Sequence, residues 1–177
     1  MKASDVDPRD LLLPKVRLAL AHHGILAEVL PCPDELSDTA AFCAHFGVSL
    51  GQAANAIVVS SRKVEPSVQA ICVLLGTTRL DVNKTVRELL GVKRASFADA
   101  GLSGRVTGMV MGGVTPFGVD GLPIYVDRAV LDQAEVIMGG GNRTSKLRLD
   151  PRQLGKLPNV QVVDALAQRP DPRPESA

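Results

Sequence analysis

Residues 55–75 read NAIVVSSRKVEPSVQAICVLL, and this stretch decides the fold class. Two apolar runs rich in β-branched residues, 55–61 and 68–75, flank a polar link at 62–67. Apolar runs of this length joined by a short polar link are typical of a β-hairpin. Because neither run alternates regularly with polar residues, we expect both strands to be buried on both faces, at the centre of a sheet.

Helix signals lie on either side of this hairpin. Each of the clearest helices starts near a proline or a capping residue, and a glycine marks its end. The three clearest helices cover residues 14–23, 37–46 and 82–90. Ser37 and Asp81 are the expected N-caps of the second and third, and Asp99 is the expected N-cap of a shorter helix.

Shorter apolar segments predict the remaining strands. They cover residues 25–30, 122–126, 134–138, 146–149 and 160–163. Hairpin-like neighbours outnumber strand–helix–strand units, which favours a mixed or largely antiparallel sheet over a parallel one. The sequence therefore predicts an α/β fold of the α+β kind.

The composition is that of one soluble globular domain, with 177 residues, 45% apolar and 22% charged. No run approaches the roughly 20 apolar residues of a membrane span. No apolar signal segment follows the first residues, so we expect a cytoplasmic protein with no membrane partner. The net charge of +1 and the 3% aromatic content argue against strong non-specific nucleic-acid binding and against a base-stacking platform.

The cysteines and histidines offer neither a metal site nor a nucleophile. The number of cysteines is odd and no CxxC motif is present, which indicates reduced thiols at Cys32, Cys43 and Cys72. Cys72 lies in an apolar run and is expected in the core. His22 and His23 fall at an expected helix end, and no ligand spacing for zinc and no GxSxG elbow is present. We therefore expect no metal.

Two glycine loops each follow an apolar segment. Gly112-Gly113 and 139–141 match neither a phosphate-binding loop nor a dinucleotide-binding motif. They are either tight turns or the lining of a pocket whose backbone N–H and C=O groups orient a ligand and stabilise an oxyanion. The residues alone leave both interpretations open.

A local cluster of positive charge follows the second glycine loop. Its cations, set against only Asp150, are Arg143, Lys146, Arg148, Arg152 and Lys156. This segment is either an ordinary solvated surface or a face that contacts phosphates.

Residues 105–118, RVTGMVMGGVTPFG, resemble the signature of the YbaK/EbsC family, also called the prolyl-tRNA synthetase-associated editing domain. Further segments resemble family motifs in the same order: 47–59, 80–91, 122–127 and 138–149. The resemblance covers 14–167, which leaves 1–13 as an N-terminal extension and 168–177 as a flexible tail.

This resemblance implies a single compact domain with a mixed, mostly antiparallel sheet and a barrel-like core surrounded by helices. It implies hydrolysis of the ester of mischarged aminoacyl-tRNA, in trans, with an error of the tRNA(Pro) type or a related small amino acid. The implied partners are mischarged aminoacyl-tRNA and a synthetase, with no DNA and no cofactor. Water attacks the ester carbonyl, assisted by backbone groups of the first glycine loop.

The resemblance, together with the cluster of positive charge after the second glycine loop, suggests three groups of site residues. The catalytic residues are Asn55, Gly112 and Gly113. The substrate-binding residues are Thr115, Pro116, Gly140, Gly141, Ser145 and Lys146. The tRNA-contacting residues are Arg143 and Arg148.

Two positions depart from the family pattern. Many members have Lys where this chain has Asn55, and one branch has Asp where Lys146 aligns. We therefore hypothesise that the cation has moved from one wall of the pocket to the other. The alternatives are a catalytically weak or inactive relative that binds tRNA or a synthetase, and a small-molecule esterase or amidase that uses the same glycine pocket.

Overall fold

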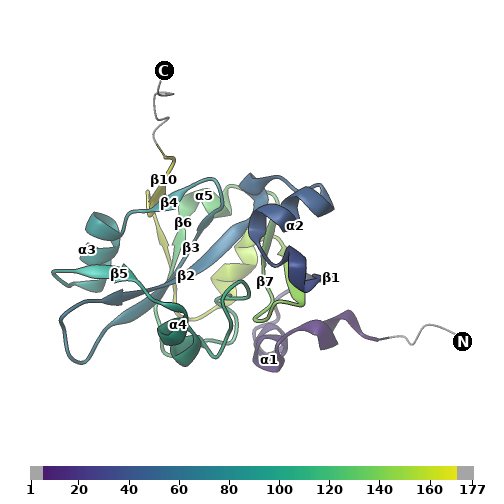
Figure 1. Cartoon of the computed structure of the whole chain (residues 1–177), viewed down its shortest axis with the longest axis horizontal. Helices are drawn as coiled ribbons and strands as arrows, with labels where there is room; N and C mark the ends of the chain where they lie inside the picture. The colour runs from purple at the N-terminus through teal and green to yellow at the C-terminus, as the bar shows by residue number, and fades with distance from the viewer. Residues whose placement is uncertain (1–5, 171–177) are drawn as a thin grey trace, which may run out of the picture.

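A five-stranded mixed sheet forms the centre of the protein, in a computed structural model that describes residues 6–170 (Figure 1). Its strand order is β5-β2-β3-β6-β9. The strands are β2 (Ala54–Ser61), β3 (Gln69–Leu75), β5 (Ala95–Phe97), β6 (Ile124–Asp127) and β9 (Val160–Val163). The predicted hairpin is confirmed, because β2 and β3 pair antiparallel with Asn55 opposite Leu74.

The outer edge of β2 is only partly covered. β5 pairs with β2 at Val59, Ser60 and Ser61, and the amide of Ala98 donates to the carbonyl of Val58. The first half of β2 extends beyond this short neighbour. This part of the strand borders the candidate site described below.

Two smaller sheets complete the strand pairing. One has the order β1-β8-β7, from β1 (Glu28–Pro31), β8 (Ser145–Leu149) and β7 (Val136–Gly139). The other pairs β4 (Arg79–Leu80) with β10 (Ala167–Gln168). The mixed, mostly antiparallel α/β prediction is confirmed, since β3–β6 and β6–β9 are the parallel pairs. The expected barrel-like core takes the form of open sheets, with no closed barrel among residues 6–170.

The helices follow the predicted order with two local corrections. They are α1 (Pro14–His22), α2 (Thr39–Phe46), α3 (Arg87–Leu90), α4 (Ala100–Thr107) and α5 (Arg128–Leu131). Asp38, not Ser37, caps α2, because its carboxylate accepts the Ala41 amide while Ser37 ends the preceding 3₁₀ turn. The helix expected at 82–90 is divided into a π-helical turn, Val82–Val86, and the short α3.

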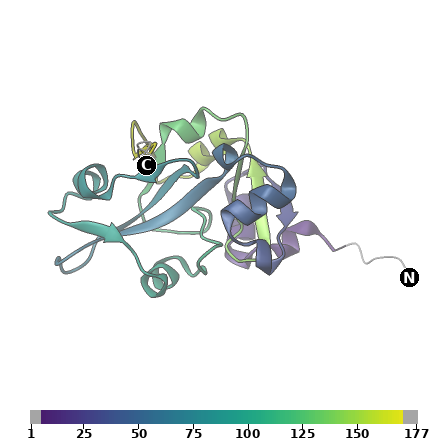
Figure 2. The ribbon, with the colours of Figure 1, turned by 45° about the horizontal axis from the view of Figure 1, so that its top comes forward.

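Both faces of the five-stranded sheet are buried, as the unbroken apolar runs predict. One face joins α1 and the second sheet in the larger core, which contains Val58, Val73 and Leu147. The other face, with Val59 and Cys72, packs beneath α3 and the turn before it. Burying each large apolar side chain contributes roughly 1.5–3 kcal/mol. In Figures 1 and 2, α2 with the second sheet lies at one end of the molecule, and β5 with the β2–β3 turn lies at the other.

The segment before α1 packs onto the domain over its described part. A 3₁₀ turn, Pro8–Leu11, is followed by Leu12, which is buried in the larger core. The expected N-terminal extension and C-terminal tail lie partly outside the described residues, which exclude 1–5 and 171–177. Among the described helices, none has the length and apolar character needed to cross a membrane.

Candidate active site

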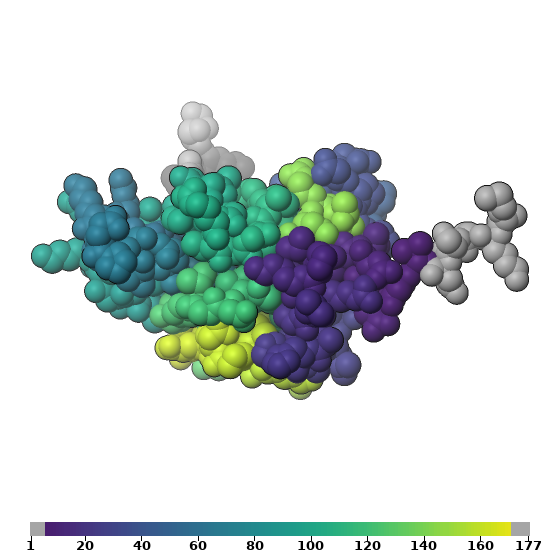
Figure 3. Space-filling view, turned by 90° about the horizontal axis from the view of Figure 1, so that it is seen from below, coloured from purple at the N-terminus to yellow at the C-terminus, as the bar shows by residue number. Residues whose placement is uncertain are grey.

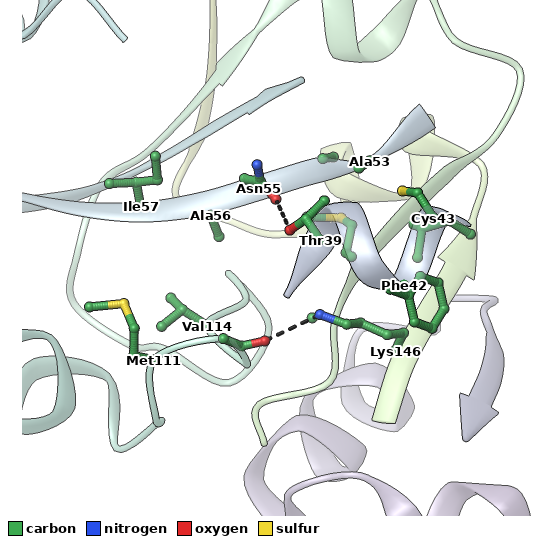
Figure 4. Close-up of a pocket in the computed structure, with 15 residues that line it drawn as sticks. Thr39, Phe42, Cys43, Ala53, Asn55, Ala56, Ile57, Met111, Val114 and Lys146 are labelled. Atoms are coloured by element: carbon green, nitrogen blue, oxygen red, sulfur yellow. Dashed lines mark hydrogen bonds between the residues drawn. The ribbon is translucent and has the colours of Figure 1, made fainter. Parts of the chain in front are cut away.

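A cavity of about 230 Å³ opens where the first half of β2 faces α2, the first glycine loop and the second sheet. Figure 4 shows its walls. The lining residues are Thr39, Phe42, Cys43, Ala53, Ala54, Asn55, Ala56, Ile57, Met111, Gly112, Val114, Ile137, Met138, Gly139 and Lys146. Most of them are apolar, so the few polar groups among them dominate how a ligand is oriented.

Asn55 forms the polar part of the β2 wall. The Thr39 hydroxyl, on the first turn of α2, donates to Oδ1 of Asn55 over 3.2 Å (Figure 4). The capping of α2 by Asp38 places Thr39 at this position. The amide of Asn55 is therefore held in one orientation by a helix that lies 16 residues earlier in the chain.

Lys146 enters the cavity from the opposite wall. It lies in β8 between β1 and β7, and only 7% of its surface is exposed. Its Nζ donates to the carbonyl of Gly112 over 3.2 Å, as Figure 4 shows. It also donates to the carbonyl of Ser37 over 3.3 Å. The Phe42 ring centroid lies 5.8 Å from Nζ. An ammonium has three N–H donors, so one remains for a ligand after these two carbonyls are satisfied.

The electrostatic environment of Lys146 is that of a buried cation without a carboxylate contact. Among residues 6–170 no carboxylate oxygen lies within 4 Å of its Nζ. Burial lowers the pKa of the Lys146 ammonium, against the opposing influence of Cys32, Cys43 and Asp38. In so apolar a site, the electrostatic effect of a cation on developing negative charge is much larger than in water.

The two glycine loops predicted from the sequence meet directly behind the cavity. The amide of Gly141 donates to the carbonyl of Gly113 over 2.8 Å. A Cβ on Gly113 would overlap the backbone of Asn142, and a Cβ on Gly139 would lie 2.7 Å from the Gly113 carbonyl oxygen. Only glycine permits this approach. Gly112, at the cavity itself, has a φ of +90°.

The segment before α1 supports the second glycine loop. The amide of Leu13 donates to the carbonyl of Gly140, and the side-chain amide of Asn142 donates to the carbonyl of Leu11. Figure 3 shows this N-terminal segment, in purple, against the yellow-green segment of the loop. The Ser145 hydroxyl adds a hydrogen bond to Oδ1 of Asn142 over 2.7 Å.

The expected site residues divide between the cavity and its support. Asn55, Gly112 and Lys146 line the cavity together. The others lie in the packed structure around it: Gly113, Thr115, Gly140, Gly141 and Ser145 are buried, and Pro116 lines a separate small cavity beside His23.

The expected tRNA-contacting arginines both form ion pairs. Nε of Arg143 lies 2.7 Å from Asp34, and Arg148 contacts Glu28 and Glu135 at 3.3 and 3.2 Å. These contacts offset much of the positive charge that the sequence of this segment displays.

The thiols are poor nucleophiles in this environment. Cys43 lines the cavity, but burial raises the pKa of its thiol. Burial also raises the pKa of Cys72 to about 12. A protonated thiol is the unreactive form, so burial disfavours the reactive thiolate of these cysteines. No group of three or more His, Cys, Asp or Glu side chains within residues 6–170 is arranged to hold a metal ion.

Sequence reasoning missed the apolar part of the site. Thr39 and Phe42 come from a helix whose apolar residues carry no chemical pattern, and Ile137 and Met138 come from a strand that reads as core. Met111 could have been found, since it directly precedes the first glycine pair. Its side chain is 54% exposed at the cavity.

Known structures share the fold of this chain. The chain is similar to the crystal structure of the hypothetical protein APE2540, with 27% identity and a TM-score of 0.76 over 87% of this chain and 99% of that one. It is also similar to a protein proposed to be a trans-editing enzyme for prolyl-tRNA synthetase, with 28% identity and a TM-score of 0.73 over 86% and 97% of the two chains.

The family model of the aminoacyl-tRNA editing domain matches residues 34–157. This range contains every residue that lines the cavity, from Thr39 to Lys146. The chain therefore belongs to the aminoacyl-tRNA editing domain family.

Proposed function

We propose that the protein is a cytoplasmic aminoacyl-tRNA deacylase that acts in trans on a small amino acid wrongly attached to tRNA, of the tRNA(Pro) type. The observation that carries the proposal is Lys146, a cation nine-tenths buried at a small cavity of an editing domain. The cavity, at about 230 Å³, is smaller than the roughly 300–1,000 Å³ of common ligand pockets. Such a volume favours a small aminoacyl group.

The reaction needs no covalent intermediate on the protein. Water adds to the ester carbonyl carbon and gives a tetrahedral intermediate with a negative oxygen. Collapse of this intermediate breaks the bond to the ribose oxygen, which takes up a proton and leaves as a hydroxyl, while the free amino acid is released. Holding water, ester and charge-stabilising donors together supplies the catalysis.

Within this reaction, Lys146 donates its remaining N–H to the developing oxyanion. It also fixes the first glycine loop through the carbonyl of Gly112. Asn55, oriented by Thr39, holds the aminoacyl group from the opposite wall. This arrangement supports the idea that the cation expected at position 55 is replaced by one at position 146.

The test is hydrolysis of a panel of tRNAs mischarged with Ala, Ser, Thr or Cys by the wild type and by Lys146→Ala. We expect turnover of at least one small aminoacyl-tRNA, lost in the variant and retained in Lys156→Ala, whose lysine is exposed on the 3₁₀ turn after β8. Tight tRNA or synthetase binding without turnover would instead favour the inactive relative, which the substitution at Asn55 motivates. Unchanged activity and tRNA affinity of Lys146→Ala would contradict the role given to Lys146.

A further inference from the structure

Most of the cations that follow the second glycine loop in the sequence contact carboxylates or backbone carbonyls of the protein itself. Besides the pairs of Arg143 and Arg148, Arg152 contacts Asp150 at 2.5 Å and Lys156 donates to the carbonyl of Gly24 over 2.7 Å. A phosphate would have to compete with these contacts. The segment 143–156 is therefore a weak candidate for binding the backbone of a tRNA.

A second group of cations lies at the far end of β2. The amide of Arg62, which follows β2, donates to the carbonyl of Arg94, which precedes β5, over 2.9 Å. Lys63 and Lys93 adjoin this pair in the chain, and all four side chains belong to exposed residues. We call these four residues the hairpin cations.

The hairpin cations are free of acidic partners in the described part of the chain. No ion pair within residues 6–170 involves any of the four, although Glu65 and Glu88 lie nearby in the sequence. Positive charge that is exposed and not paired within the protein is available to a polyanion.

The hairpin cations and the cavity lie along one strand edge. Arg62 follows Asn55 by seven positions along the strand, which at roughly 3.3 Å per residue is about 23 Å. The cavity borders the first half of the outer edge of β2, and β5 with Arg94 continues along the second half. In Figures 1 and 2, β5 and the β2–β3 turn extend from this edge away from α2.

An exposed aromatic side chain lies between the cavity and the hairpin cations. Phe97 is 55% exposed and is directly opposite Val59 in the β2–β5 ladder. Residues directly opposite each other in a ladder share a face of the sheet, so Phe97 lies on the face of Val59. Side chains two residues apart on a strand also share a face, so Ile57 and Asn55 lie on that face too. Aromatic faces of this kind stack unpaired bases.

We propose that the outer edge of β2 and β5 is the tRNA-binding surface. The unpaired 3′ end runs from the cavity along this edge, with a base stacked on Phe97, and the hairpin cations bind the phosphates of the acceptor stem. This inference rests on the proposed deacylase function for the identity of the ligand. It places the main phosphate contacts at the end of the domain opposite α2.

The test measures binding of uncharged tRNA to the full chain, so its result does not depend on ester hydrolysis. We compare Arg62→Gln/Arg94→Gln with Arg152→Gln/Lys156→Gln, since each pair removes two exposed cations. We expect the first pair to weaken tRNA binding by roughly ten-fold or more at low salt. For this variant, the plot of the logarithm of the binding constant against the logarithm of the salt concentration should also become shallower. The slope should change by about 0.9 for each phosphate that the variant no longer neutralises. The second pair should change binding less than two-fold.

Binding of the isolated single-stranded 3′ end, as a short RNA, tests Phe97. Phe97→Ala should weaken it on the order of ten-fold, and Phe97→Tyr should retain it, because the stacking face is kept. The hairpin-cation pair should leave binding of this short RNA within two-fold of the wild type.

Equal effects of the two cation pairs on tRNA binding, or no effect of either, would overturn the proposal. Loss of tRNA binding only in the Arg62→Gln/Arg94→Gln variant, with no hydrolysis of any mischarged tRNA by the wild type, would support the surface and reject the deacylase. If the hairpin cations affect synthetase binding but not tRNA binding, the surface serves a protein partner and the proposal is wrong.

Discussion

Nζ of Lys146 lies 3.2 Å from the carbonyl oxygen of Gly112, so a buried cation in one sheet holds the loop that forms another wall of the cavity. The loop is also tied at Gly113, which accepts the amide of Gly141. Charge and loop geometry are therefore coupled at this site. Changing the lysine alters both the electrostatics of the cavity and the position of the first glycine loop.

Replacing Lys146 by Met should remove activity without unfolding the protein. The variant keeps the volume of the side chain but loses the charge, and loss of one preorganised oxyanion donor costs about 10²–10³-fold in kcat. The variant loses two hydrogen bonds to the carbonyls of Ser37 and Gly112, but it also no longer buries an ammonium. Because these two effects oppose each other, the free energy of unfolding should stay within about 2 kcal/mol of the wild type. Kinetics and urea unfolding measure the two effects. Lys156→Met is the control, and a collapse of stability with proportional loss of activity would point to a purely structural lysine.

The pH dependence should report the lowered pKa of Lys146. Deacylation that needs the ammonium should decline as pH rises, starting below the ordinary lysine pKa of 10.5 because burial lowers the folded-state value. The rate is corrected at each pH for spontaneous ester hydrolysis in the absence of protein.

The same shift has the opposite sign for stability. Between the folded-state pKa and 10.5, the unfolded chain binds more protons at Lys146 than the folded chain does. The contribution of this residue to the free energy of unfolding should therefore increase with pH across that window. Subtracting the free energy of unfolding of Lys146→Met from that of the wild type at each pH isolates this contribution. If the wild-type value minus the variant value fell as pH rises, the burial of an ammonium would be contradicted.

Exchanging the two polar walls tests whether the cation can occupy either one. Asn55→Lys alone places two cations at one cavity, and we expect it to lower stability by about 1–3 kcal/mol and to reduce activity. The double exchange Asn55→Lys/Lys146→Asn restores a single cation. Its activity should exceed that of Lys146→Asn by on the order of ten-fold in the mischarged-tRNA assay. Activity no higher than that of Lys146→Asn would show that only position 146 can hold the charge.

Gly113→Ala should destabilise the protein by roughly 1–3 kcal/mol or more, because the added Cβ would lie 2.6 Å from the carbonyl carbon of Asn142. Backbone atoms form the contact, so no side chain can turn aside. Gly155→Ala is the matched control, since no atom lies within 4 Å of a Cβ at that position. Thermal unfolding measures both, and equal melting temperatures would mean that the two loops can separate at no cost.

The central hairpin could be predicted because its information is local. Two apolar runs with a polar link specify paired strands. Burial of both faces of the hairpin, with Val58 on one face and Val59 on the other, follows from the absence of alternation. The sequence predicts the cap of α2 one residue too early, because Ser37 and Asp38 both have side chains that can cap a helix. Only the backbone at this turn decides between them.

The burial of Lys146 could not be predicted in the same way. Between Arg143 and Arg148 it reads as part of a charged surface, and the strand period alone does not say which face is solvated. That depends on β1 and β7 flanking β8, and on Phe42 of α2, which come from distant parts of the chain. The resemblance supplied the position as part of a site, but not its two carbonyl partners.

The contact between the glycine loops has a consequence for how this cavity can change. Positions 113, 139 and 141 have no room for a further carbon atom, because neighbouring atoms lie within 2.7 Å of where it would stand. Met111, by contrast, projects its side chain where more than half of it is exposed. Selection in the laboratory for a different aminoacyl group should therefore accumulate substitutions in α2 and at Met111. The glycine loops should remain unchanged in the selected variants. The preference for the aminoacyl group can therefore change while the reaction stays the same.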